Sequence, residues 1–140
     1  MTEQIWRRAS GGPSQEPRTV IHIDDAPLAE RTDGLEPAIE LRPLVSDDCD
    51  VAVLTFTFPP GYVGKVHWHP ADTVYVVRRG QFIVEGEGTY EVGDLRWVKA
   101  GTVYGPESAG PDGCEVMLIA AGTFPLPTFP PEAAPPSSEV

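Results

Sequence analysis

The chain has 140 residues, which suits one domain and leaves no room for a second hydrophobic core. Its 21 acidic and 10 basic residues give a net charge of -11, which repels phosphate backbones and anionic lipid. Neither nucleic acid nor a membrane is therefore an expected partner. No segment approaches the roughly 20 apolar residues of a bilayer span, and the N-terminus lacks the apolar run of a secretory signal, so we expect a cytoplasmic protein.

Residues 1–19 and 125–140 are rich in Pro, Ser, Gly and charge and are predicted to be poorly ordered tails around one domain over residues 20–124. Inside that domain, runs of β-branched and aromatic residues recur, and each run ends at a turn signal. No window of a dozen residues has the apolar spacing of a helix. The pattern predicts an all-β sandwich or barrel of about nine short strands, at residues 19–24, 38–45, 50–58, 65–69, 73–79, 81–87, 88–92, 95–100 and 114–122.

Three residues outside the main motifs have simple interpretations. His22 lies on the first expected strand and is predicted to be structural or exposed. Cys49 and Cys114 are far apart and belong to no Cys-x-x-Cys pair, so both are expected to be buried as small hydrophobic residues.

His67 and His69 stand two residues apart on the expected strand 65–69. Side chains at this spacing project from the same face, about 6 to 7 Å apart along the chain, so the two imidazoles can converge on one point. Strand histidines are also often exposed or hydrogen-bonded, so the pair alone is a weak metal signal. Trp68 lies between them and must face the other way, where it could contact a second subunit.

The glycines around this pair strengthen the metal interpretation. The segment from Gly61 to Gly80 follows the spacing G-x5-H-x-H-x10-G, and residues 93–104 keep the glycine spacing of a second motif, G-x7-G. At these two motifs the sequence resembles the cupin superfamily, over roughly residues 20–123. The resemblance implies a double-stranded β-helix, or jelly-roll barrel, with one divalent metal inside it.

Two positions depart from the usual cupin ligands, because Thr73 replaces a glutamate and Tyr104 replaces the third histidine. The surrounding block resembles the small ChrR-like cupins, which include acetylacetone dioxygenases and the cupin domains of anti-sigma factors. That resemblance implies that Glu85 could enter the metal chamber and complete a 2-His-1-carboxylate site with His67 and His69. Such a site favours Fe(II), with Zn²⁺ or Ni²⁺ as alternatives. A shift of one residue in register would instead point Glu85 to solvent.

Two tyrosines are candidate catalytic residues. Tyr104 could bind the metal as a phenolate, donate a hydrogen bond to the substrate, or pack as an ordinary aromatic residue. Tyr75 resembles a tyrosine that lines the chamber of related enzymes and could act as an acid or base, or simply pack in the core. Of the neighbours Arg96 and Trp97 one must face inward, and we expect Trp97 to do so.

Together these features favour a metal-dependent enzyme that acts on a small organic substrate, most plausibly an Fe(II) dioxygenase that cleaves a C–C bond in a diketone-like compound with O2. The first alternative is a non-oxidative lyase, isomerase or cyclase that uses a Zn²⁺ or Ni²⁺ ion. The second is a non-enzymatic sensor of a small molecule or metal. A homodimer is expected, because pairing removes exposed strand edges.

Overall fold

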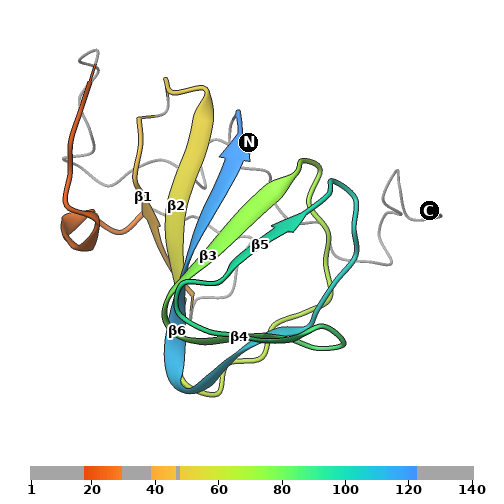
Figure 1. The fold of residues 1–140 in the computed structure, drawn as a ribbon. Helices are drawn as coiled ribbons and strands as arrows, with labels where there is room; N and C mark the ends of the chain where they lie inside the picture. Colours follow the sequence, from red (N-terminus) through yellow and green to blue (C-terminus); the bar gives the residue numbers. More distant parts are fainter. Residues whose placement is uncertain (1–17, 30–38, 47, 123–140) are drawn as a thin grey trace.

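A computed structural model describes residues 18–29, 39–46 and 48–122 of the chain. This part contains one short 3-10 helix and six strands (Figure 1). The helix η1 covers Ile23–Asp25, and the strands are β1 Glu40–Pro43, β2 Val51–Phe58, β3 Thr73–Val84, β4 Gly88–Tyr90, β5 Leu95–Val98 and β6 Glu107–Ala121.

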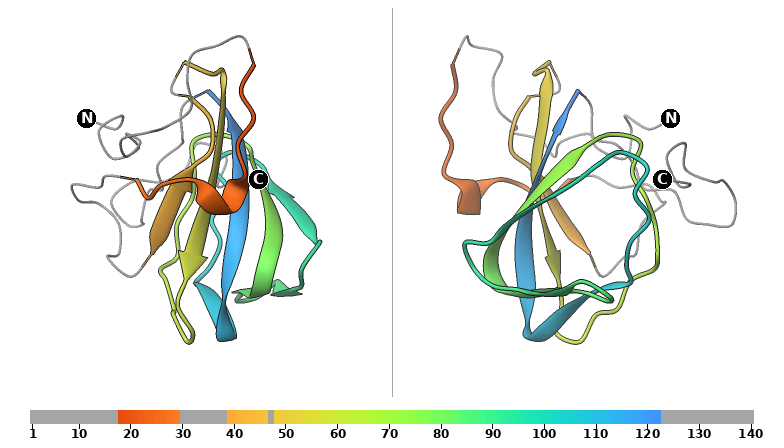
Figure 2. Two further views of the ribbon diagram at one scale, coloured as in Figure 1. Left: turned by 90° about the vertical axis from the view of Figure 1, so that its left-hand side faces the viewer. Right: turned by 45° about the vertical axis from the view of Figure 1, so that its right-hand side comes forward.

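All strand pairs are antiparallel, in the order β1-β2-β6-β3-β4, with β5 paired to β3. Strands β3 and β6 are long, and they pair with each other along three stretches that are separated by two shifts in register, one on each side of Arg79 and Gly80. These shifts bend the pair, so that β3 faces β5 with its first half and β4 with its second half. The two views of Figure 2 show the resulting curvature, in which β3 to β6 and their connections wrap around the core.

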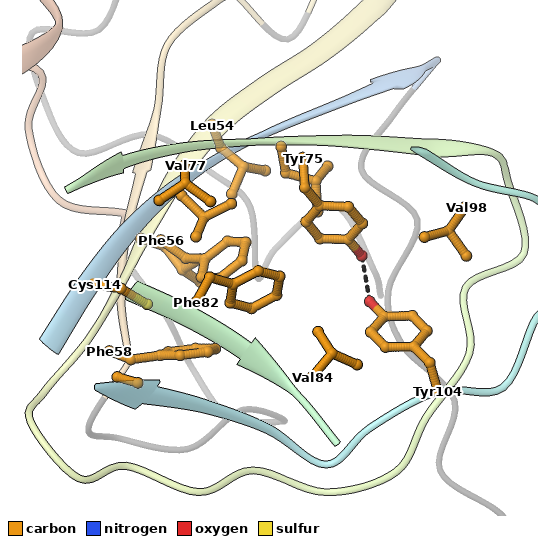
Figure 3. Packing of buried hydrophobic residues seen from close by; sticks show 14 of the residues in the cluster. Leu54, Phe56, Phe58, Tyr75, Val77, Phe82, Val84, Val98, Tyr104 and Cys114 are labelled. Carbon is orange, nitrogen blue, oxygen red and sulfur yellow. Dashed lines mark hydrogen bonds between the residues drawn. The ribbon is translucent and has the colours of Figure 1, made fainter. Parts of the chain in front are cut away.

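The core is built from the inward faces of β2, β3 and β6. Alternate residues are buried along β3 and along the last part of β6, as the period of two in a pleated strand requires, whereas β2 and the middle of β6 bury several residues in a row. Aromatic rings fill its centre, with Phe56 and Phe58 at 5.0 Å between ring centroids and Phe56 and Phe82 at 6.2 Å (Figure 3). Seven side chains are the largest that are fully buried: Tyr75, Phe82, Leu118, Val84, Val116, Thr55 and Thr73.

The all-β prediction is confirmed, but several strand predictions are wrong. Residues 19–24 contain η1 in place of a strand, and the exposed His22 caps this helix by accepting a hydrogen bond from Asp24 N at its Nδ1 (3.3 Å). Residues 65–69 form only an isolated bridge. The expected strands 73–79 and 81–87 are one strand, because the bend near Gly80 interrupts the register without ending the pairing.

Of the two cysteine predictions, one is confirmed and the other is wrong. Cys114 is buried as expected, whereas Cys49 is exposed because it lies in the turn before β2. No helix in the part of the chain that the structure describes is long and apolar enough to cross a membrane. Residues 1–17 and 125–140, predicted to be tails, lie outside the described residues.

Candidate functional site

The histidine pair lies in the connection between β2 and β3, and the segment before β6 holds it in place. His67 and Tyr104 form an antiparallel bridge in which each backbone N–H donates to the other carbonyl at 3.0 Å. His67 and His69 are both only 7% exposed, and their rings lie nearly perpendicular with centroids 5.1 Å apart. The two imidazoles therefore lie close together, as predicted, although residues 65–69 do not form a regular strand.

The hydrogen bonds of His67 determine which ring nitrogen is available. Its Nδ1 lies 2.8 Å from the carbonyl oxygen of Lys65, and because a carbonyl can only accept, Nδ1 must carry the proton. In the neutral ring Nε2 is then a lone-pair acceptor. That atom faces inward, 3.1 Å from the Tyr104 hydroxyl.

The Tyr104 hydroxyl also contacts the hydroxyl of Tyr75 from the facing strand β3, and Figure 3 shows the two groups pointing toward each other. Because the Tyr104 proton can be donated to His67 Nε2, Tyr75 can donate its own proton to the Tyr104 oxygen. Burial is the main cause that raises the pKa of both tyrosines, and the buried carboxylate of Glu107 adds to it. Without a metal cation beside them, both phenols are thus held protonated.

Glu107 is a buried carboxyl group that the sequence analysis missed. It is 7% exposed, and its Oε2 lies 3.9 Å from His67 Nε2. Burial raises its pKa, while the nearby His67 and Arg96 oppose that rise. Residues 105–113 contain two prolines and three glycines and resemble a loop, so Glu107 was not placed on a strand. Glu107 and Ala109 stand two residues apart and are both buried on β6, and this strand-like spacing is the signal by which Glu107 could have been found.

The prediction that Trp97 faces the core is wrong. Trp97 is 65% exposed, and its neighbour Arg96 points inward from β5 instead, with a side chain that is only 9% exposed. The guanidinium carbon lies 4.4 Å from the ring centroid of Tyr104 and 5.1 Å from that of Tyr75. Val98 is buried on the same side of β5, so the alternation along the strand requires Trp97 to face outward.

The structure does not bring Glu85 to the histidines. Glu85 follows the buried Val84 at the end of β3, and in the turn there its side chain is exposed. Because successive side chains point to opposite faces of a strand, Val84 points inward and the next residue points outward. Thr73, at the position of the usual cupin glutamate, is buried at 1% exposure. In the described part of the chain, no three or more His, Cys, Asp or Glu residues are grouped so that they could hold a metal ion.

Comparison with known proteins places this arrangement in a fold family. No family model matches the chain, and no curated protein matches it. Among solved structures, a candidate acetylacetone dioxygenase from Methylibium petroleiphilum PM1 aligns with a TM-score of 0.61 and 19% identity, over 87% of this chain and 88% of that one. This chain has the cupin fold. The polyketide cyclase RemF from Streptomyces resistomycificus also aligns, with a TM-score of 0.61 and 19% identity over 80% of this cupin and 81% of RemF.

The anti-sigma ChrR of Rhodobacter sphaeroides, solved in complex with SigE, aligns at a TM-score of 0.56 and 17% identity. This match covers 71% of the present cupin but only 51% of that chain. The resemblance to ChrR-like and acetylacetone dioxygenase-like cupins is thus confirmed at the level of the fold. At these identities the three structures say nothing further about the reaction of this chain.

Proposed function

We propose that this cupin is a metal-dependent enzyme that acts on a small carbonyl compound, with C–C bond cleavage by an Fe(II) dioxygenase as the first reaction class. The observation that carries the proposal is the orientation of His67. Its Nδ1 is fixed by the Lys65 carbonyl, and its Nε2 lone pair faces two buried oxygen atoms. Metal-binding histidines are commonly oriented in this way, by a backbone carbonyl on the nitrogen that does not bind the metal.

The donor atoms fit one metal ion only when a tyrosine is included. Bonds of about 2.0–2.2 Å place two ligands of one ion about 3 to 3.5 Å apart. The 3.1 Å between His67 Nε2 and the Tyr104 oxygen matches this separation, whereas the 3.9 Å to Glu107 exceeds it. His67, His69 and Tyr104 would hold the ion, with Glu107 beside them and Glu85 outside the set.

A bound divalent ion would supply Lewis acidity, and iron would also supply chemistry with O2. The protein residues bind and orient the substrate and hold its protons. Tyr75 is the nearest proton donor to the Tyr104 oxygen, and its raised pKa keeps it able to donate to a carbonyl oxygen of the substrate. The surrounding apolar side chains, including Val84 and Val98, exclude water from this point.

A specific observation favours a second candidate, a non-oxidative isomerase or cyclase. The continuous hydrogen-bonded chain from Tyr75 through Tyr104 to His67 can transfer a proton between two sites on one substrate without O2. A sensor role has no comparable support from this site.

Elemental analysis of protein purified without chelator tests the metal. We expect about one iron per chain, which is lost in His67→Ala and reduced in Tyr104→Phe. His22→Ala, at an exposed histidine, is the matched control and should keep the metal, and Glu85→Ala tests the expectation from the sequence. No bound metal after incubation with Fe(II), Zn²⁺ and Ni²⁺ would contradict the proposal. If metal is bound, turnover of acetylacetone under air but not under nitrogen supports the dioxygenase, and equal turnover under both supports the second candidate.

A further inference from the structure

The guanidinium of Arg96 is divided between two environments. Its Nε and Nη2 atoms each donate to a different oxygen of Glu87 at 2.7 Å, so this edge of the group is fully used. The third nitrogen, Nη1, is buried and has no hydrogen-bond partner in the described part of the chain. Arg96 is also a member of the inward-facing group of side chains, directly opposite Tyr75 across the β3–β5 pair.

This placement leaves a charged donor in the barrel interior beside the tyrosine pair. The rings of Tyr104 and Tyr75, at 4.4 and 5.1 Å from the guanidinium carbon, stabilise its positive charge through their faces but provide no oxygen acceptor there. A buried donor without an acceptor loses its hydrogen bonds to water and gains none in return, and this cost is larger for a charged donor. Such a group in a native protein commonly has a role in binding or catalysis.

The ion pair with Glu87 explains how the charge is maintained. Glu87 neutralises the positive charge of Arg96, and the same contact lowers the pKa of Glu87. The carboxylate therefore stays ionised and holds the fork in place, so that Nη1 is aimed away from Glu87 and toward the interior. A carboxylate oxygen of a ligand is the partner that suits Nη1 best, because a hydrogen bond between two ionised groups is stronger than one between neutral groups.

We propose that Arg96 is the anion-binding residue of the barrel and that the substrate carries a carboxylate. This inference deepens the proposed function and rests on it for the role of the ligand as a substrate. His67 Nε2 and the guanidinium of Arg96 both lie close to Tyr104, so one small carbonyl acid beside this residue can contact both. A neutral carbonyl compound would leave Nη1 without its acceptor.

The test compares acetoacetate with acetylacetone, which are close in shape but differ in charge. Dissociation constants are measured by calorimetry, both for metal-loaded protein and for chelator-treated protein. We expect wild type to bind acetoacetate at least 10-fold more tightly, in both preparations. Arg96→Lys should weaken acetoacetate binding about 10- to 100-fold because a point charge replaces the planar fork, with little change for acetylacetone. Arg79→Lys, at an exposed arginine on the outer face, is the matched control and should bind as wild type does.

Two outcomes would overturn the inference: equal affinity of wild type for both compounds, or an unchanged preference for the anion in Arg96→Lys. The conservative variant keeps the charge beside Glu87, and its melting temperature reports whether it is folded. An Arg96→Met, Glu87→Gln double variant removes both charges together and should abolish the preference. Because the chelator-treated protein is measured separately, absence of metal contradicts only the proposed function, and loss of the preference in both preparations contradicts only the role of Arg96.

Discussion

The hydroxyl of Tyr104 is the atom on which most of the site depends. It lies 3.1 Å from His67 Nε2 and contacts Tyr75, and the ring that carries it packs against the guanidinium of Arg96. The ring itself is packed at 6% exposure, so removal of the oxygen leaves its packing intact. The hydroxyl can therefore be tested apart from the fold.

We expect Tyr104→Phe to lower the turnover of acetylacetone about 100-fold, because a positioned proton donor or acceptor contributes this much to a reaction. Its melting temperature should stay close to that of wild type. Tyr90→Phe is the control, since the Tyr90 hydroxyl donates to Glu87 (3.0 Å) and not to His67, and its removal should change turnover little. Initial rates at saturating substrate make the comparison, and equal rates for the two variants would remove Tyr104 from the mechanism.

At the scale of the elements, the bend in the β3–β6 pair allows these two long strands to run through both halves of the barrel. Gly80 has a φ of +68°, in the left-handed region, and an added Cβ would overlap the carbonyl oxygen of Gly113 across the bend. Gly86, in the turn after β3, has a φ of +84° but open space around the same position. Comparing substitutions at the two glycines therefore separates the cost of backbone strain from the cost of steric overlap.

Gly80→Ala should lower the free energy of unfolding by about 2 kcal/mol more than Gly86→Ala does. Both variants introduce the same strain of about 1 to 2 kcal/mol, but only Gly80→Ala also forces the strands apart. Urea unfolding followed by circular dichroism gives both values. Equal losses would show that the β3–β6 bend can widen without cost.

A network of charges attaches η1 to the outer face of β3 and β6. Arg78 and Arg79 both bond to Glu115, at 2.6 and 2.8 Å, and Arg79 also bonds to Asp24 at 3.0 Å. The hydrogen bond from Arg79 is the largest cause that lowers the pKa of Asp24 below 3.8. This carboxylate therefore stabilises the fold above its unfolded pKa, and the contribution is lost as the pH falls through the lower folded pKa.

Asp24→Asn should accordingly reduce the melting temperature slightly at pH 6 and bring it level with wild type in acid, below the folded pKa. Asp25→Asn is the control, because Asp25 lies in the same helix outside this network. Differential scanning calorimetry at a series of pH values provides the curves. A difference between wild type and Asp24→Asn that persists unchanged into acid would contradict the assignment.

At the scale of the whole molecule, the outer face of the sheet is an apolar surface that takes no part in the proposed site. Val53, Ile119, Val74 and Trp97 form one apolar row across β2, β6, β3 and β5, and Trp97 and Leu95 are 65% and 60% exposed. Apolar rows of this kind on a soluble protein commonly mark an interaction surface. The homodimer predicted from the sequence would have this face available for a second copy.

Multi-angle light scattering is expected to report a dimer for wild type and a monomer for Trp97→Asp. Val63→Asp, at an equally exposed valine (65%) outside this row, should remain dimeric. A monomeric wild type at high concentration would refute the prediction of a homodimer.

Local signals in the sequence predicted a large part of this protein. The alternation of apolar residues gave the β class, and the spacing of Gly61, Gly80, Gly93 and Gly101 around the histidines gave the cupin fold. The proximity of His67 and His69 also followed from the sequence, because the two residues are neighbours and an extended chain projects both side chains to one side.

Only the tertiary structure decided which other side chains meet that pair. The inward turn of Arg96 and the outward turn of Trp97 and Glu85 depend on register, and a shift of one residue reverses every such choice. Glu107 reaches His67 from 40 residues away in the sequence, because β6 pairs with the far half of β3. The sequence by itself thus determined the all-β class and the closeness of the two histidines, whereas long-range pairing determined the rest of the site, since no local pattern encodes which strands meet.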